Sequence, residues 1–391
     1  MQFSLTSNQH QWRDQVRQFL AAELPPEREM GRASEEDAEG WEFARAFNRA
    51  LGKRGWLTAA WPREYGGLAL SFTDQAIYME EMTYHRAPLT PSQMAIRMAG
   101  STIIVHGTDE QKRQHLPCIA SGDRVFCQGF SEPNAGSDLA SLQTRAIADG
   151  DDFIVNGSKI WTSHAHNADW MMLLARTDPT APKHRGITFF LLEMDTPGIT
   201  VQPLINMGGL HAFNQVFFDN VRVKRENIVG ELDRGWYVAT TTLDFERSGI
   251  HRAAEAHRTL DEVLSFLRTT AGAETSARRA VLRHVAAERA VEVQIGRLMA
   301  YRVATLQDAR QIPNHEASVS KLYGSELIQR VSRFGVDAFG LAGHLRQGSA
   351  PAISDGRFAS NYLLSISATI AGGASEVQRG IIATRGLGLP R

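Results

Sequence analysis

Cysteine is scarce in this chain of 391 residues, where only Cys118 and Cys127 are present. Two cysteines are too few for a disulfide framework. A free cysteine usually behaves as a small, buried apolar side chain, and we expect both residues to do so. A reducing, cytoplasmic setting is the simplest interpretation.

Long apolar runs and an excess of one charge are also absent. No apolar stretch approaches the ~20 residues that a membrane-spanning helix needs, and Met1 to Leu5 lack the basic and apolar regions of a signal peptide. The formal net charge is −1, which gives no electrostatic reason to expect nucleic acid or an anionic membrane as a partner. We therefore expect neither partner, and we expect no bound metal.

The composition, 43% hydrophobic and 22% charged, is that of a globular protein. Over the first ~120 residues the pattern is helical, within the few-residue error of such boundaries. Thr6 and Gln9 have the spacing of a capping box, and Trp12, Val16 and Phe19 follow on one face of a helix. We expect an N-terminal α-helical domain over residues 1–122.

Between Phe126 and Val223 the pattern changes to short β-branched and aromatic runs separated by turn residues. Phe153 to Val155 is predicted to be a short strand that ends at the turn Asn156-Gly157. Several strands at this spacing indicate a compact antiparallel barrel or sandwich, which we place at residues 123–232.

Helical periodicity returns after Gly235. Val291, Ile295, Leu298 and Met299 form one apolar stripe, as expected for an amphipathic helix that packs in a bundle. We expect a helical bundle over residues 233–391, and so a mostly α fold with a central β domain.

Two short stretches carry the strongest functional signal, namely Ser131 to Asp138 (SEPNAGSD) and Ile370 to Arg379 (IAGGASEVQR). Together with Gly157 to Ser163 and Gly235 to Arg247, they resemble, in content and order, the signatures of the acyl-CoA dehydrogenases, flavoenzymes that desaturate thioesters. The resemblance covers essentially the whole chain. It implies an N-terminal helical domain, an antiparallel β-barrel, a C-terminal four-helix bundle and a homo- or heterotetramer.

The resemblance also implies that the chain binds FAD. A flat apolar ring with hydrogen-bonding edges suits a stacking aromatic residue beside hydroxyl and backbone donors. By resemblance, Trp161 packs near the ring and Ser163 bonds its reactive nitrogen edge, whereas taken alone Trp161 would more simply be a core residue. The other implied cofactor contacts are Gln128, Phe130, Ser131, Ser375 and Glu376, and, toward the flavin of a neighbouring subunit, Asp337, Gly340 and Leu341.

One element of the family is missing. Many acyl-CoA dehydrogenases carry an arginine-phenylalanine-glycine element that contacts the flavin pyrophosphate, and none is found between Arg268 and Arg279. The flavin affinity, or the number of occupied sites in an assembly, is therefore open.

The implied substrate contacts are Ser137, Asp244, Arg247 and Gly372, which would hold an acyl-CoA. Taken alone, Ser137 would be a turn or cap residue, and Asp244 with Arg247 a solvated pair on a helix. Gly372-Gly373 has physical sense of its own, because it lets the backbone approach a ligand just before a helix that opens at Ser375. The alternative is a loop-to-helix junction whose glycines serve only the backbone geometry.

Desaturation of a thioester removes an α-proton and a β-hydride, and the proton requires a positioned general base. Many family members carry that glutamate where this chain has Gly372, but a subset places it on the helix where this chain has Glu246. Glycine keeps its N–H for the substrate carbonyl. We therefore predict that Glu246 is the base, with a pKa raised by an apolar pocket. The alternative is that Glu246 is a surface residue.

The resemblance further suggests a branched, cyclic or steroid side-chain acyl group, because Gly372 leaves room beside the α-carbon, and an electron-transferring flavoprotein as electron acceptor. Three other functions remain open: a non-catalytic subunit of a heterotetrameric acyl-CoA dehydrogenase, a flavin-dependent monooxygenase on the same fold, and a lyase-type relative.

Overall fold

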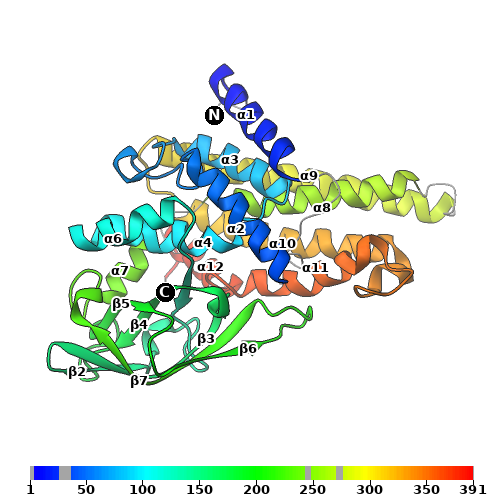
Figure 1. Ribbon diagram of the computed structural model, residues 1–391. Helices are drawn as coiled ribbons and strands as arrows, with labels where there is room; N and C mark the ends of the chain where they lie inside the picture. Colours follow the sequence, from blue (N-terminus) through cyan, green and yellow to red (C-terminus); the bar gives the residue numbers. More distant parts are fainter. Residues whose placement is uncertain (1–3, 26–36, 243–247, 270–275, 391) are drawn as a thin grey trace.

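The computed structural model describes residues 4–25, 37–242, 248–269 and 276–390. A group of helices comes first, a sheet follows, and longer helices complete the chain (Figure 1). The helices that precede the sheet are α1 (Ser7–Glu23), α2 (Ala38–Lys53), α3 (Phe72–Tyr84), α4 (Thr90–Met94), α5 (Ser101–His106) and α6 (Asp109–Ala120).

The predicted capping box at the start of α1 is confirmed. The Thr6 hydroxyl accepts a hydrogen bond from the Gln9 backbone at 3.3 Å, and the Gln9 side chain accepts one from the Thr6 backbone at 3.0 Å. Val16 and Phe19 are buried, as their spacing predicted. Local signals alone were sufficient here, because a cap acts within a single turn.

The sheet has seven strands in the order β1-β4-β2-β3-β7-β6, with β5 also paired to β4. Most pairs are antiparallel, but β1 and β2 each run parallel to β4, which makes the sheet mixed. The strands are β1 (Phe126–Gly129), β2 (Arg145–Asp149), β3 (Asp152–Ser163), β4 (Trp170–Arg176), β5 (Ile187–Glu193), β6 (Ile199–Leu204) and β7 (Phe213–Lys224).

The prediction that a strand ends at Val155 was wrong. β3 continues through Asn156-Gly157 as far as Ser163, and its pairing with β7 shifts register between Val155 and Gly157. Gly157 has φ +144°, and an added Cβ would lie 2.8 Å from the Cα atom of Thr144. The glycine therefore serves a β-bulge inside a long strand, not a turn between two strands.

The remaining helices are α7 (Gly235–Thr242), α8 (Ile250–Thr269), α9 (Ser276–Asp308), α10 (His315–Ala338), α11 (Arg357–Ser365) and α12 (Ser375–Ile381). Helices α8, α9 and α10 pack against one another around Leu260, Val263, Leu327 and Val331. The apolar stripe of α9 found in the sequence does not face this core. Val291 and Leu298 are 60% and 42% exposed, and Val293 and other residues of α9 fill the core instead.

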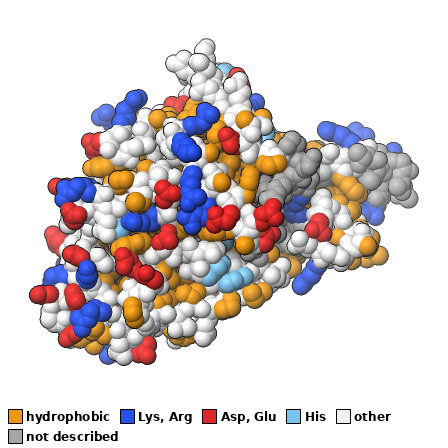
Figure 2. Space-filling model, viewed as in Figure 1, with side chains coloured by type: hydrophobic (Ala, Val, Ile, Leu, Met, Phe, Trp, Pro, Cys, Tyr) orange, Lys and Arg blue, Asp and Glu red, His pale blue; other side chains and the backbone are white. Residues whose placement is uncertain are grey.

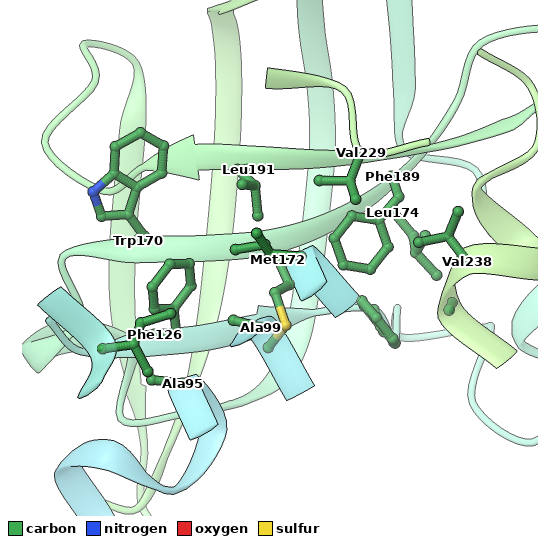
Figure 3. Close-up of a cluster of buried hydrophobic side chains, with 14 of the residues drawn as sticks. Ala95, Ala99, Phe126, Trp170, Met172, Leu174, Phe189, Leu191, Val229 and Val238 are labelled. Atoms are coloured by element: carbon green, nitrogen blue, oxygen red, sulfur yellow. The ribbon is translucent and has the colours of Figure 1, made fainter. Parts of the chain in front are cut away.

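One face of the sheet packs against the N-terminal helices. Figure 3 shows Phe126, Trp170 and Met172 of the sheet close to Ala95 and Ala99. Two hydrogen bonds of 2.8 Å from the Gln111 side chain of α6 to the backbone after β7 also join the two layers. This packing fixes the position of β1 and of the loop that follows it.

Cys127 is buried and Cys118 is half-buried, and both are free thiols. The expected burial is therefore confirmed for Cys127, whose thiol pKa is raised by that burial.

On the face drawn in Figure 2, acidic and basic side chains are interspersed. Among the helices described, none combines the length and the apolar character that crossing a membrane requires.

Candidate active site

The loop after β1 lies against β3. The Ile160 backbone N–H donates to the Ser131 carbonyl at 2.9 Å, and the Lys159 ammonium donates to the Phe130 carbonyl at 3.0 Å. These bonds bring two groups of predicted flavin contacts together. Gln128, Phe130 and Ser131 come from β1 and its loop, and Trp161 and Ser163 come from β3.

Trp161 is not a core residue. Its side chain is 59% exposed, and its φ of +60° is unusual for a residue that is not glycine. It lies in a second register shift of β3, between Lys159 and Thr162, with its ring edge-to-face with Phe213 at a centroid distance of 5.9 Å. A backbone held in such a conformation costs on the order of 1–3 kcal/mol and is typical of functional sites.

Phe130 can offer only its backbone to a ligand. Its ring is buried edge-to-face against Phe189, with a centroid distance of 5.9 Å. Ser163 is half-buried beside Phe213 on β7. Ser163 is therefore partly accessible to a ligand, and a contact with Phe130 is limited to its main chain.

Gly372 and Gly373 form an open turn before α12, which we call the glycine turn. Their φ values are +63° and +87°, and a Cβ at Gly372 would meet no heavy atom of the described residues within 4 Å. The predicted helix start at Ser375 is confirmed. The Ser375 hydroxyl is buried without a hydrogen-bond partner among these residues, whereas Glu376 is exposed. An unpaired buried hydroxyl is unfavourable and is a feature of sites that bind a ligand or an ordered water.

Two neighbouring residues of α10 hold the segments that flank the predicted base and the glycine turn. The Ser320 hydroxyl donates to the Ser248 carbonyl at 2.8 Å, and the Lys321 ammonium donates to the Ala368 carbonyl at 3.2 Å. Burial and the nearby Arg252 lower the Lys321 pKa to about 8.

The catalytic candidate Glu246, with Asp244 and Arg247, lies outside the described residues.

Asp337, Gly340 and Leu341 lie at the other end of α10. Asp337 is exposed and pairs with Arg333 at 3.7 Å, and Leu341 is 91% exposed. Because Lys321 and Asp337 are sixteen residues apart on one helix, a rise of ~1.5 Å per residue separates them by about 24 Å. Within a single chain, these three residues do not join the glycine turn.

Three family models together match nearly the whole chain. They are the acyl-CoA dehydrogenase N-terminal domain over residues 6–123, the middle domain over 127–221 and the C-terminal domain over 233–387. The chain belongs to the acyl-CoA dehydrogenase family.

Similar members of the family cover the chain from end to end. The acyl-CoA dehydrogenase FadE26 of Mycobacterium tuberculosis is 36% identical over 100% of this chain and 99% of its own. The acyl-CoA dehydrogenase IpdE1 of the same organism is 35% identical over 97% of this chain and 98% of its own. The chain is accordingly an oxidoreductase of the acyl-CoA dehydrogenase type.

Solved structures agree in fold. The structure named "Tcur3481-Tcur3483 steroid ACAD" has a TM-score of 0.90 at 34% identity, and the ChsE4-ChsE5 complex from Mycobacterium tuberculosis has a TM-score of 0.89 at 34% identity. Both comparisons cover 100% of each chain. The expected architecture, helices around a central β domain, is confirmed.

Sequence reasoning missed several residues of this acyl-CoA dehydrogenase site. Lys159 and Glu132 form a buried ion pair at 2.8 Å beneath the loop after β1. The signal was available, because a lysine and a glutamate stood inside two family motifs, but neither motif shows which charges meet. Arg278 was also missed. It donates to the Ala338 carbonyl at 3.3 Å, beside Gly340, in the region where the expected arginine element is lacking.

Ser137 is exposed, and the adjacent Asp138 forms an ion pair with Lys183 at 2.5 Å. Asp138, not Ser137, occupies the N-cap position of the short helical turn that follows. Ser137 is therefore not the cap of that turn, and its contact with CoA stays a prediction for this acyl-CoA dehydrogenase.

Proposed function

We propose that this acyl-CoA dehydrogenase uses FAD to desaturate an acyl-CoA thioester, with Glu246 as the general base. The observation that carries the proposal is the pair of hydrogen bonds from Ser320 and Lys321. They hold Ser248, two residues after Glu246, and Ala368, four residues before Gly372, against adjacent residues of α10. These two bonds bring the described residues on either side, Ser248 and Ala368, to one part of α10, which supports a base from the Glu246 segment at the glycine turn.

The residues present fit FAD. The exposed, strained Trp161 offers an aromatic face, and the hydroxyls of Thr162 and Ser375 are buried without partners in the described structure. Trp161 and Ser163, with the backbone at Phe130 and Ser131, would hold the cofactor. When bound, FAD would supply the acceptor for the β-hydride.

Gly372 would polarise the thioester carbonyl through its backbone N–H. Its φ of +63° is a backbone conformation that glycine adopts more easily than other residues, and the space around it is open. The proton must then go to a carboxylate on another segment, and Glu246 is our candidate.

The test is anaerobic mixing of the purified protein with a panel of acyl-CoAs while the flavin absorbance is followed. Glu246→Gln should slow flavin bleaching by ~10²–10⁴-fold, the usual contribution of a positioned acid–base group. Glu226→Gln is the control, because that carboxylate is exposed on the β domain and pairs only loosely with Lys224 at 3.3 Å. Bleaching at the wild-type rate in Glu246→Gln would remove Glu246 from the mechanism.

For the substrate we propose a branched, cyclic or steroid side-chain acyl group. The support is the open space at Gly372 together with the name of a similar protein of known structure, which describes that protein as a steroid ACAD. We further propose a cytoplasmic setting and an electron-transferring flavoprotein as acceptor. The proposed acyl group is tested with acyl-CoAs of different shapes in the same panel. A preference for straight-chain acyl-CoAs would contradict it.

A second candidate is a partner subunit without its own base chemistry. Two similar structures carry the names of two different proteins each, and the sequence has no arginine-phenylalanine-glycine element between Arg268 and Arg279. The measurement that separates the candidates is the flavin content per chain of the protein purified alone. One flavin per chain that is bleached by acyl-CoA supports the catalytic subunit. A chain without flavin and without bleaching supports the partner subunit.

A further inference from the structure

A fully buried lysine lies beneath the predicted flavin contacts. Lys159 of β3 has no exposed surface, and its ammonium group donates to the Glu132 carboxylate at 2.8 Å and to the Phe130 carbonyl at 3.0 Å. Burial lowers the Lys159 pKa to about 8, which still leaves it protonated at neutral pH. The ammonium therefore links β3 to the loop that follows β1.

Glu132 also connects the loop after β1 to the residues that precede β2. Its carboxylate accepts hydrogen bonds from the backbone N–H groups of Gln143 at 2.6 Å and Thr144 at 2.8 Å. Burial opposes ionisation, but Lys159 and these donors outweigh it and hold the Glu132 pKa below its ordinary value. The backbone of Glu132 also exchanges two hydrogen bonds with Ala135, of 2.9 and 3.0 Å. Glu132 thus connects several parts of residues 130–144 through its carboxylate and its backbone.

A buried ion pair is a weak way to stabilise a fold, because desolvation of both charges offsets most of their attraction. What the pair does provide is geometry. It fixes the Phe130–Ser131 backbone against β3 two residues before Trp161, at the beginning of the bulge that carries that ring.

We propose that Lys159 and Glu132 are positioning residues. They hold the Phe130–Ser131 edge at a fixed separation from Trp161, so that one flavin fits between them, and they hold the loop that presents Ser137 to the substrate. This inference rests on the proposed function, because it assumes a flavin at this place. It adds a role for two charged residues that contact neither ligand.

Three variants separate positioning from bulk stability. The double variant Glu132→Gln/Lys159→Met removes both charges together and so avoids leaving one of them buried alone. In this variant the glutamine side chain has one acceptor oxygen in place of two. Its N–H₂ group cannot accept a hydrogen bond, so one of the Gln143 and Thr144 backbone N–H groups loses its partner. Glu132→Asp keeps the charge pair but shortens the carboxylate by one methylene. Asp149→Asn is the control, because it weakens an exposed pair with Arg222 at 2.5 Å on the same sheet.

Two measurements are made on each purified protein: amide hydrogen exchange over residues 130–144, and the Kd for FAD by fluorescence titration. The thermal midpoint of each protein is recorded as well, as a check on overall stability. We expect the double variant to exchange the Gln143 and Thr144 amides at least tenfold faster and to raise the FAD Kd at least tenfold. Glu132→Asp should give the same changes to a smaller extent at a wild-type thermal midpoint. The control should match the wild type in both measurements.

The two failures are distinguishable. If the wild type binds no FAD, the proposed function fails, while hydrogen exchange still decides whether the ion pair holds the loop. Unchanged protection of Gln143 and Thr144 in the variants overturns the inference. So does an FAD Kd within twofold of wild type in Glu132→Asp and in the double variant. If the double variant does not fold, Glu132→Asp alone decides.

Discussion

Ser375 shows at the scale of one residue how a binding site differs from a core. Its hydroxyl is buried at the start of α12 with no partner in the part of the chain that the structure describes. The buried Ser325 hydroxyl on α10, in contrast, reaches the Lys321 and Leu322 carbonyls at 2.9 and 3.1 Å. A folded protein keeps an unpaired buried hydroxyl at a cost, and such groups are found where a ligand or a strained backbone has a function.

We therefore predict opposite effects for one substitution at two serines. Ser375→Ala should leave the stability of the FAD-free protein unchanged or slightly raised, because no hydrogen bond is lost, and should weaken FAD binding several-fold. Ser325→Ala should destabilise the protein by about 1 kcal/mol through its lost hydrogen bonds and leave the FAD Kd unchanged. Thermal unfolding with and without FAD measures both effects. A stability loss in Ser375→Ala equal to that in Ser325→Ala would show that Ser375 has a partner after all.

At the scale of elements, α1 is attached to α3 by ion pairs. Arg17 makes two hydrogen bonds to the Glu81 carboxylate at 2.8 and 3.0 Å, and Arg13 contacts it at 3.0 Å. Arg13 also reaches Glu80 at 2.7 Å, which pairs in turn with Arg297 of α9. Glu81 therefore joins α1 to α3, and Glu80 joins α1 to the C-terminal bundle.

The ionisation of Glu81 gives this junction a pH dependence. Burial opposes the charge, but hydrogen bonds from His85 and Arg17 and the charges of Arg17 and Arg13 outweigh it, so the Glu81 pKa lies below its ordinary value of 4.5. A depressed pKa contributes stability that is fully present above that ordinary value and is lost as the pH falls through the folded-state pKa.

We predict that Glu81→Gln lowers the stability at pH 7 by about 1–3 kcal/mol, because it leaves half-buried arginine groups without their acceptor. The variant should also lose less stability than the wild type between pH 5 and pH 3, since its junction no longer titrates. Glu110→Gln is the control, because that carboxylate pairs with Arg113 on an exposed surface. Thermal midpoints against pH check the prediction, and parallel curves for Glu81→Gln and wild type would contradict it.

The elements predicted correctly are those whose signals are local. The start of α1 depends on Thr6 and Gln9 alone, and the start of α12 on the glycines just before Ser375. The full length of β3 escaped prediction, because Asn156-Gly157 suggests a turn until Thr144 and β7 are known to lie beside it. The ion pair of Lys159 and Glu132 escaped for the same reason, since its partners are 27 residues apart.

At the scale of the whole molecule, α9 leaves an apolar face uncovered. Val291, Ile295 and Leu298 are spaced as i, i+4 and i+7 and are 60%, 37% and 42% exposed, so they form one stripe along the helix. The sequence pattern detected this stripe and indicated a bundle helix, but periodicity shows that a face is apolar without showing what covers it. A contiguous exposed apolar face on a bundle is typical of a subunit interface.

We therefore predict that this stripe is buried in the proposed homo- or heterotetramer. The double variant Val291→Glu/Leu298→Glu should shift the assembled protein to smaller species, because each introduced carboxylate would be desolvated in the interface. Ile147→Glu is the matched control, since Ile147 is 62% exposed but lies on β2 of the sheet. Size-exclusion chromatography with light scattering measures the mass of each species. Asp337 lies about 24 Å along α10 from Lys321, by the ~1.5 Å rise per residue, and Gly340 and Leu341 follow the end of that helix. Dissociation should therefore also lower the FAD content if these residues serve a neighbouring subunit. An unchanged mass in the double variant would contradict the assigned interface, and a lower mass with full FAD content would separate assembly from flavin binding.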